Sequence, residues 1–345
     1  MDWEGKSIKV GAVVICMALL LRLLAGGMWD KLLLALTSPQ AVSAMLFLET
    51  GRVVRPVGET FPTETAPAPT ETVTPTAPVI TEPTVPQPAE QEIQAVFSAA
   101  DAALVEVRSV CGYTADVADC LTKQLAWDLT GEGPTVLIVH SHGTESYENT
   151  EQYLESSRYR TKDPMYNVVS VGDRLVQILE QGGIKAVHDR QAHDDPSYSE
   201  SYNNSRKSIA HYLEAYPTIR LVLDIHRDAV EDADGKQLGF SVETGDGTAA
   251  RLMLVVGSDA GGLQHPNWGE NMSLAVKLHA QLEKNTPGIC RPISFRSQRF
   301  NQDLSAGALI VEVGSAGNTR QEALAAVELL GQAIIDLAHG TVACE

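Results

Sequence analysis

The chain from about residue 130 alternates between short apolar runs and amphipathic stretches. Mostly apolar runs, which are typical of strands buried on both faces, lie at residues 135–139, 184–187, 219–225, 251–256 and 308–313. Apolar residues recur every three or four positions at residues 168–181, 201–215, 271–283 and 319–338, which predicts helices. Strands that alternate with helices form parallel βαβ units, so the pattern predicts an α/β fold with a mostly parallel sheet flanked by helices.

The N-terminal segment contains an apolar run that is long enough to cross a membrane. Residues 10–29 carry a single charge, Arg22, and a helix of that length spans a hydrocarbon core of roughly 30 Å. Lys6 and Lys9 precede the run and favour a cytoplasmic amino end. A cleaved signal peptide is the alternative, but no small-x-small site follows the run. We therefore expect residues 1–31 to form a cytoplasmic tip and a single-pass membrane anchor.

A proline-rich linker separates this anchor from the globular part of the chain. Residues 32–56 form a juxtamembrane segment, and residues 57–90 contain eight Pro, nine Thr and no Lys or Arg. Such a composition buries too little apolar surface to fold and favours extended polyproline II, so it acts as a spacer. Residues 91–345 are then the predicted globular domain, with a helical lead-in over residues 91–129.

The composition is that of a globular protein with an acidic surface. Apolar residues make up 44% of the chain, and the net charge is −18. A phosphate-binding surface needs clustered Lys and Arg, so we expect no nucleic-acid partner. None of the five cysteines forms a CxxC pair, which argues against a cysteine zinc site. Cys111 and Cys120 are either a local disulfide or free thiols.

Ionisable residues lie at the ends of three predicted strands. The first strand is followed by His140, His142 and Glu145, the third by His226, Arg227 and Asp228, and the last apolar run contains Glu312 near its end. In an open α/β sheet, sites form beyond the carboxyl ends of the strands. We therefore expect these side chains to meet at one edge of the sheet.

Two histidines and a carboxylate suit a catalytic zinc ion, which takes three protein ligands and leaves one position for water. His142 and Glu145 are three positions apart, so a turn after the strand can direct both to one point. His226 arrives from a neighbouring strand. The sequence therefore predicts a zinc site formed by His142, Glu145 and His226.

Two points of this ligand set stay open. Strand alternation directs His140 and His142 to the same side, so either can serve as the ligand, and the HxxE spacing favours His142. The carboxylate ligand is Glu145 or, if Glu145 only supports the site, Asp163 or Glu148.

Other residues near the strand ends suit supporting roles. Glu312 is the expected general base and acid. Arg227 is expected to bind a substrate carboxylate or to stabilise the oxyanion of the tetrahedral intermediate. The remaining candidates are Asp224 and Asp228 as partners of His226, His193, Tyr198 and Tyr202 in or beside a polar loop that forms a wall of the cleft, and Asn318 after the last strand.

Six blocks between residues 136 and 338 resemble, in order, the stage II sporulation protein P family. Among them are VLIVHSHGTESY, HDDPSYSESYNNS, LVLDIHRDA and RFNQDLSAGALIVEVGSAGNT. The resemblance implies the α/β fold of the zinc N-acetylmuramoyl-L-alanine amidases. It also implies that a His of the HSH block and His226 hold the zinc, with Glu312 as the catalyst. The wider amidase group takes its ligand glutamate from the start of the first helix, where this chain offers only Asp163.

The resemblance also implies a function and a location. We expect a zinc-dependent peptidoglycan hydrolase that cleaves the N-acetylmuramoyl-L-alanine amide, with endopeptidase activity on peptide cross-links as a further property of the family. It implies a single-pass protein of the cell membrane with an extracytoplasmic catalytic domain, which works at the sporulation septum during engulfment with sporulation protein D and sporulation protein M.

Two other hypotheses remain. One is a non-catalytic module that binds peptidoglycan or a partner, and the other is a zinc carboxypeptidase that acts only on wall peptides. The sequence leaves open the bond preference, the oligomeric state and the regulation of activity.

Overall fold

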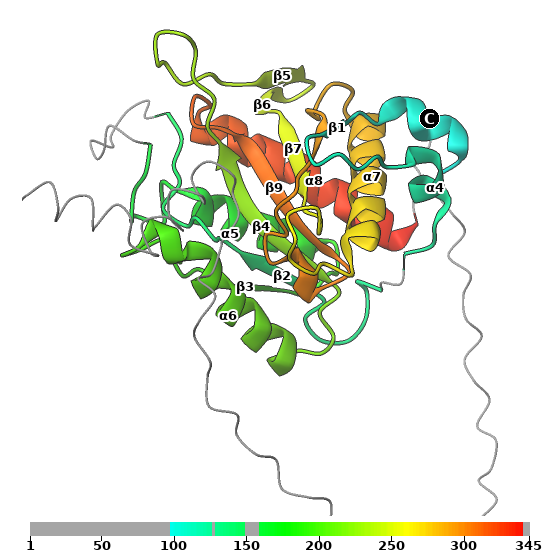
Figure 1. Ribbon diagram of the computed structural model, residues 1–345. Coiled ribbons are helices and arrows are strands. Elements are labelled where there is room, and N and C mark those ends of the chain that lie inside the picture. Colours follow the sequence, from blue (N-terminus) through cyan, green and yellow to red (C-terminus); the bar gives the residue numbers. More distant parts are fainter. Residues whose placement is uncertain (1–96, 126–127, 149–158, 341–345) are drawn as a thin grey trace, which may run out of the picture. The chain divides into compact units, whose positions relative to one another are not determined.

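The predicted strands form the centre of a seven-stranded sheet in a computed structural model that describes residues 97–125, 128–148 and 159–340. The sheet order is β1-β8-β7-β9-β4-β2-β3 (Figure 1). These strands are β1 (Val107–Ser109), β2 (Val136–Val139), β3 (Ala186–His188), β4 (Leu221–Asp228), β7 (Leu252–Val256), β8 (Ile293–Phe295) and β9 (Ala308–Ser315). Neighbouring strands run parallel except β7 and β9, which are antiparallel. The prediction of a mostly parallel sheet is confirmed.

Helices cover both faces of the sheet, as predicted. α5 (Val168–Gln181), α7 (Trp268–Asn285) and α8 (Arg320–His339) pack on one face, and α6 (Ser201–Ala215) packs on the other. Figure 1 shows α6 and α8 on opposite sides of the strands. The Asn167 side chain caps α5 by accepting a hydrogen bond from Val169 N. Thr319 and Glu322 form a capping box at the start of α8.

The larger core lies on the face that α5, α7 and α8 cover. Leu223 of β4 and Val311 of β9 are fully buried there. α5 and α8 approach closely at Gly331, because a Cβ at that position would be 2.6 Å from Ile178. On the α6 face, the apolar contacts form two smaller clusters, one of which contains Ile310 of β9.

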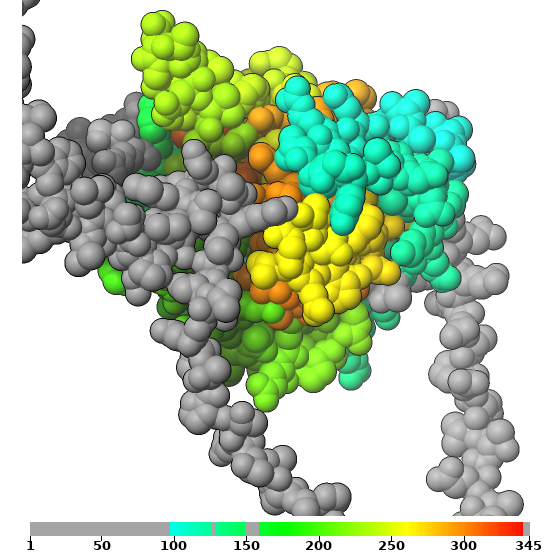
Figure 2. All heavy atoms as spheres, viewed as in Figure 1, coloured from blue at the N-terminus to red at the C-terminus, as the bar shows by residue number. Residues whose placement is uncertain are grey.

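The prediction of a helix over residues 91–129 is wrong in the described part of that segment. The segment holds a 3-10 helix (Ala99–Leu104), β1 and the short helix α4 (Val117–Thr122). Val107 of β1 pairs with Ile293 of β8, and such a long-range pairing leaves no mark in the local hydrophobic pattern. Figure 2 shows these residues, in cyan, against the yellow helix α7.

The structure adds one element that was not predicted, decides the state of two cysteines, and does not describe the N-terminal segments. β5 (Ser241–Thr244) and β6 (Gly247–Ala250) form an antiparallel ribbon that was not predicted. Cys111 and Cys120 are free thiols. The predicted membrane anchor and the proline-rich linker lie outside the described residues, and within the described ranges no helix is both long and apolar enough to span a membrane. The domain boundaries stay predictions.

Candidate metal centre

The carboxyl ends of β4 and β9 bring two predicted residues together. His226 and Glu312 are Cα partners in neighbouring parallel strands, so their side chains project from the same face of the sheet. Both strands extend beyond the apolar runs, to Asp228 and Ser315. The hydrogen bonds of the sheet therefore fix the positions of His226 and Glu312.

His142 and Glu145 reach the same edge from the turn that follows β2. Glu145 N donates to His142 O at 3.0 Å, which closes the turn. Ser141 N donates to Asp224 Oδ1 at 2.7 Å and ties the turn to β4. A Cβ at Gly143 would be 2.9 Å from the backbone of the loop after β3, so the turn can pack against that loop only with glycine there. The HxxE spacing thus places both side chains on one side of a tight turn.

His142, Glu145 and His226 form a buried cluster of potential metal ligands. One donor atom from each lies within 4.8 Å of the other two. Glu145 Oε1 is 3.5 Å from His142 Nδ1, and Glu145 Oε2 is 3.4 Å from His226 Nδ1. Two imidazoles and a carboxylate are donors that zinc prefers. The residues therefore fit a zinc ion.

Neighbouring carboxylates set the charge of this cluster. Asp224 Oδ1 is 2.8 Å from His226 Nε2. Because a carboxylate only accepts, Nε2 carries a hydrogen, and Nδ1, on the side of Glu145, is the nitrogen whose proton a metal ion would displace. Burial lowers the pKa of His226, but Asp224 and Glu145 outweigh it and raise that pKa well above its ordinary value. A site that attracts a proton so strongly also attracts a metal cation.

The Arg227 side chain contacts the Glu145 carboxylate and is itself fixed by the backbone. Its buried guanidinium donates from Nε to Ser146 O at 2.9 Å and from Nη2 to Tyr159 O at 2.8 Å. Nη1 is 3.5 Å from Glu145 Oε1. Burial opposes ionisation of Glu145, yet Arg227 and the two histidines keep the pKa of this carboxyl well below its usual range. These contacts favour a positioning role, and the expected contact of Arg227 with substrate stays a prediction.

Arg160 and Asp194 extend this network, and sequence reasoning missed both. Arg160 Nη2 is 3.3 Å from Glu145 Oε1, and Arg160 Nη1 donates to Asp194 Oδ2 at 2.8 Å. The Arg160 guanidinium also lies 4.7 Å from the centre of the Tyr198 ring. No spacing rule connects Arg160 to a strand end. The position of Asp194 next to His193, in the polar loop singled out from the sequence, is the one signal that pointed this way.

Glu312 lies beside the ligand cluster, and one of its carboxylate oxygens is not hydrogen-bonded to a described residue. Its Oε2 atom is buried and has no hydrogen-bond partner in the described part of the chain. Burial raises the pKa of Glu312 to about 8, against the opposing attraction of His226. A carboxyl group with a pKa near neutral pH can both accept and release a proton. These properties suit the predicted general base, although the role itself stays a prediction.

His140 occupies a different environment from His142. It is fully buried, its Nδ1 lies 2.9 Å from Ile225 O, and its Nε2 lies 2.7 Å from His188 Nε2. The expectation that His140 and His142 share one side is wrong, because β2 ends at Val139 and the chain then turns. Both ring nitrogens of His140 are engaged, so His142 is the histidine that meets the other ligands.

Two more predictions need correction. Asp228 lies beyond a register shift from His226 and pairs instead with Arg291 at 2.8 Å, so it does not orient the histidine. Asn318 is buried, and its side chain binds the backbone N–H and C=O of Phe240. It fastens the loop after β9 and does not face the ligand cluster with a free polar group.

The remaining predicted residues divide between the loop and the surface. His193 is buried and its Nε2 lies 2.8 Å from Asp189 Oδ2, so it supports the polar loop from within. Asp163 and Glu148 are exposed and do not belong to the ligand cluster. Glu145 is therefore the carboxylate in that cluster.

Two tyrosines border His142. The Tyr198 ring stacks on the imidazole with centroids 4.5 Å apart, and the Tyr202 ring meets it edge to face at 5.4 Å. Tyr198 is 57% exposed and therefore lies at the protein surface. Both rings therefore lie beside the ligand cluster, and their role in the wall of a substrate cleft stays a prediction.

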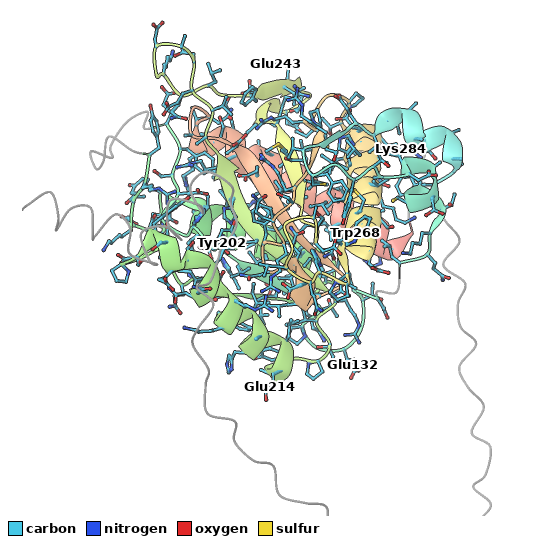
Figure 3. The ribbon with its side chains drawn as sticks, viewed as in Figure 1. Glu132, Tyr202, Glu214, Glu243, Trp268 and Lys284 are labelled. Carbon is cyan, nitrogen blue, oxygen red and sulfur yellow. The ribbon has the colours of Figure 1, made fainter. Side chains whose placement is uncertain are left out.

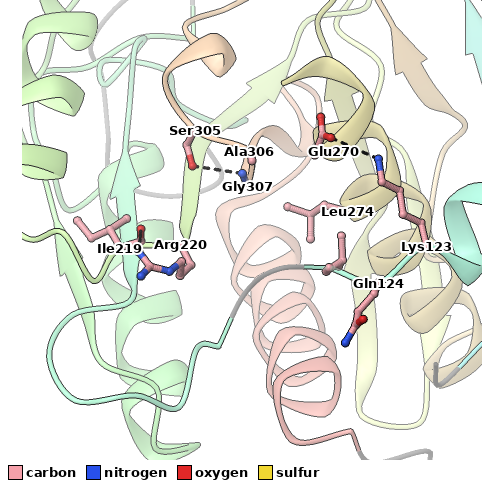
Figure 4. A pocket seen from close by; sticks show the side chains of 10 residues that line it. Lys123, Gln124, Ile219, Arg220, Glu270, Leu274, Ser305, Ala306 and Gly307 are labelled. Atoms are coloured by element: carbon pink, nitrogen blue, oxygen red, sulfur yellow. Dashed lines mark hydrogen bonds and ion pairs between the residues drawn. The ribbon is translucent and has the colours of Figure 1, made fainter. Parts of the chain in front are cut away.

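A cavity of about 400 Å³ lies elsewhere, at the amino ends of the strands (Figure 4). Arg220 and Gly307 line it and directly precede β4 and β9. Leu274 contributes apolar surface, and Lys123 and Glu270 form an ion pair at 3.3 Å on its wall. The cavity is thus at the opposite ends of the strands from His226 and Glu312.

Comparisons with known proteins give a family and several structural likenesses. The family model described as Stage II sporulation protein P matches residues 65–335. Stage II sporulation protein P of Bacillus subtilis (strain 168) is 30% identical over 205 residues, which are 56% of this chain and 48% of that protein. The chain therefore spans about half the length of this curated relative.

Several solved structures that are similar to this chain are amidases of low sequence identity. N-acetylmuramoyl-L-alanine amidase AmiC2 of Nostoc punctiforme is 17% identical with a TM-score of 0.36, covering 61% of this chain and 97% of that one. The CwlD amidase from Clostridioides difficile, in complex with the GerS lipoprotein, is 11% identical with a TM-score of 0.37, covering 60% and 95%.

Proposed function

Because the chain belongs to the stage II sporulation protein P family, we propose that it is a zinc-dependent peptidoglycan hydrolase that cleaves the amide between N-acetylmuramic acid and the L-alanine of the stem peptide. The observation that carries this proposal is the meeting of His142, Glu145 and His226 within 4.8 Å, at the edge of the sheet where Glu312 lies.

The protein residues divide the work of the proposed reaction. A zinc ion bound by His142, Glu145 and His226 would polarise the scissile carbonyl and lower the pKa of a water molecule. Glu312 accepts a proton from the attacking water and delivers it to the leaving amine, for which a pKa near neutrality is well suited.

Other side chains hold the ligands in place. Asp224 keeps the His226 hydrogen on Nε2, and Arg227 holds the Glu145 carboxylate. Such neighbours restrict the ligands to one orientation, which a metal site needs for affinity and for reactivity.

We further propose that the protein acts at the sporulation septum during engulfment. Family membership supports this location, as does the predicted anchor and spacer arrangement of residues 1–90. An extracytoplasmic domain, sporulation proteins D and M as partners, and cleavage of peptide cross-links belong to the same proposal.

Replacement of Glu312 tests the function directly. The native and Glu312→Gln proteins should each bind one equivalent of zinc, but Glu312→Gln should release stem peptides from purified cell walls about 10²- to 10⁴-fold more slowly, because the proton carrier is lost. Zinc content is measured by atomic emission and the products by mass spectrometry. Glu243→Gln, at an exposed residue of β5 (Figure 3), is the matched control and should keep full activity.

The products also separate the competing hypotheses. A zinc carboxypeptidase would leave the muramoyl–alanine bond whole, and a binding module would release nothing and need no zinc. Full activity of Glu312→Gln would contradict the assigned role of Glu312.

A further inference from the structure

Amide hydrolysis needs a hydrogen-bond donor near the carbonyl oxygen, where negative charge develops in the transition state. From the sequence, Arg227 is the expected donor. In the structure its guanidinium is bound to Ser146 O and Tyr159 O and lies against Glu145. Arg227 is thus engaged in holding Glu145, which leaves room for another residue as a donor beside the proposed zinc ion.

Tyr202, in the first turn of α6, lies on the face of the sheet that carries His226 and Glu312. It packs against the apolar cluster of Met253, Val255 and Ile310. Met253 is the Cα partner of Glu312 across β7 and β9, and Ile310 precedes Glu312 by two positions on the same face of the strand. Figure 3 shows Tyr202 at the end of α6 beside the strands. The ring therefore lies between His142 and the strand that carries Glu312.

The contacts of Tyr202 fix its ring but leave its hydroxyl group unused. The ring meets His142 edge to face at 5.4 Å and lies 5.8 Å from Phe300. Asn301 Nδ2 donates to Tyr202 O at 2.8 Å and fastens the backbone. The hydroxyl makes no hydrogen bond with any residue that the structure describes.

The hydroxyl stays protonated at neutral pH and so remains a donor. A phenol ordinarily loses its proton only at about pH 10. The Tyr202 hydroxyl therefore supplies a hydrogen without adding negative charge to the site.

We propose that the Tyr202 hydroxyl is a catalytic group that donates a hydrogen bond to the carbonyl oxygen of the scissile amide as that oxygen becomes negative. This inference rests on the proposed amidase function. No bond to Tyr202 forms or breaks, and its proton stays on the phenol. Tyr198, which is stacked flat on His142 and largely exposed, is not suited to this role.

Tyr202→Phe removes the hydroxyl and keeps the ring. With a defined muropeptide as substrate, kcat should fall about 10²- to 10³-fold with little change in KM, as expected when an oxyanion donor is lost. The zinc affinity, measured by competition with a chelator, should stay within about twofold, because the ring still supports His142. Tyr212→Phe, on the same helix and stacked on Tyr216, is the matched control and should be unchanged.

A second measurement does not depend on turnover. A muramoyl–alanine analogue with a phosphinate group in place of the amide mimics the tetrahedral oxyanion, and calorimetry gives its affinity for the zinc-loaded protein. Tyr202→Phe should bind it about tenfold or more weakly than the native chain, because a hydrogen bond to a charged oxygen is lost. Both proteins are compared below their unfolding midpoints, so that a change in stability does not enter.

The outcomes separate this proposal from the function on which it rests. Unchanged kcat and phosphinate affinity in Tyr202→Phe would overturn the role of Tyr202 while leaving the amidase function intact. A parallel loss of zinc affinity would also overturn it, because Tyr202 would then act through His142. If the zinc-loaded native protein cleaves no muramoyl amide, the proposed function fails, and the role of Tyr202 in that reaction fails with it.

Discussion

The two faces of the sheet differ in what they bury, and β4 shows the difference residue by residue. On the face under α5, α7 and α8, β4 contributes Leu221, Leu223 and Ile225 to the larger core, whereas its alternate residues on the α6 face are Val222, Asp224 and His226. All six are buried. One face therefore gains free energy from apolar packing, and the other holds ionisable groups that apolar burial alone would not stabilise.

This division explains how a buried polar site can exist in a marginally stable fold. Removing Asp224 and His226 from water carries a desolvation cost, which their mutual hydrogen bond offsets only in part. Apolar burial on the opposite face of the same strand supplies stability without restricting the polar groups. If this view is correct, substitutions at adjacent positions of β4 should have separable effects.

The largest expected effect on stability comes from the core face. Leu223→Ala should lower the free energy of unfolding by about 2–5 kcal/mol, because it removes buried methyl groups and leaves a cavity. Chemical denaturation measures this change. The zinc affinity of the folded fraction should stay within about twofold, since the Leu223 side chain faces away from the site.

Leu223→Met is the matched control, because it nearly conserves volume and should cost less than about 1.5 kcal/mol. A tenfold loss of zinc affinity in folded Leu223→Ala would show that the two faces are coupled and would break the comparison.

The neighbouring position should give the converse result. Asp224→Asn keeps the size of the side chain but offers an N–H as well as a carbonyl group to His226 Nε2, so it no longer fixes the hydrogen on that nitrogen. We expect zinc affinity to fall about 10- to 100-fold, which is typical when the partner of a ligand histidine is lost. Chelator competition measures the affinity. Asp246→Asn, at an exposed residue between β5 and β6, should have no effect.

Unchanged zinc affinity in Asp224→Asn would mean that Asp224 does not orient His226 towards a metal. The difference between the two faces would then concern burial alone and not chemistry.

The elements on which this comparison depends could be predicted because their signals are local. The apolar runs of β2, β4 and β9 and the periodic pattern of α5, α6 and α8 reflect burial that each segment imposes on its own sequence. β1 and β8 could not be predicted, because neither lies in a mostly apolar run and the two pair across a long separation in the sequence. The antiparallel contact of β7 with β9 depends likewise on where the chain returns to the sheet.

The residues of the candidate site likewise include some that local sequence patterns predict and some that they do not. His226 and Glu312 follow from strand ends, and His142 with Glu145 follows from the spacing of a turn. Arg160 reaches Glu145 through a loop whose path no local pattern specifies. The alternation of side chains along a strand does not hold for His140 and His142, because β2 ends at Val139 and both histidines lie beyond it.

The smallest expected effect on stability concerns the N-cap of α8, which lies close in sequence to Glu312. Thr319 is the N-cap of α8, in the loop that follows β9, and its Oγ1 accepts a hydrogen bond from Glu322 N at 3.2 Å. Thr319→Ala should lower the free energy of unfolding by about 1 kcal/mol through the loss of this cap, which is about 2–4 °C in melting temperature for a domain of this size. Thr319→Ser keeps the oxygen and should restore most of the loss.

Activity should be unchanged in Thr319→Ala, because Asn318 still fastens the loop by accepting hydrogen bonds from Ser315 N and Phe240 N. Calorimetric melting and muropeptide release, measured on the same preparations, check both expectations. A tenfold fall in kcat would show that the cap of a core-face helix positions Glu312 across the border. Stability and chemistry would then be joined at the end of β9, even if they remain separate along β4.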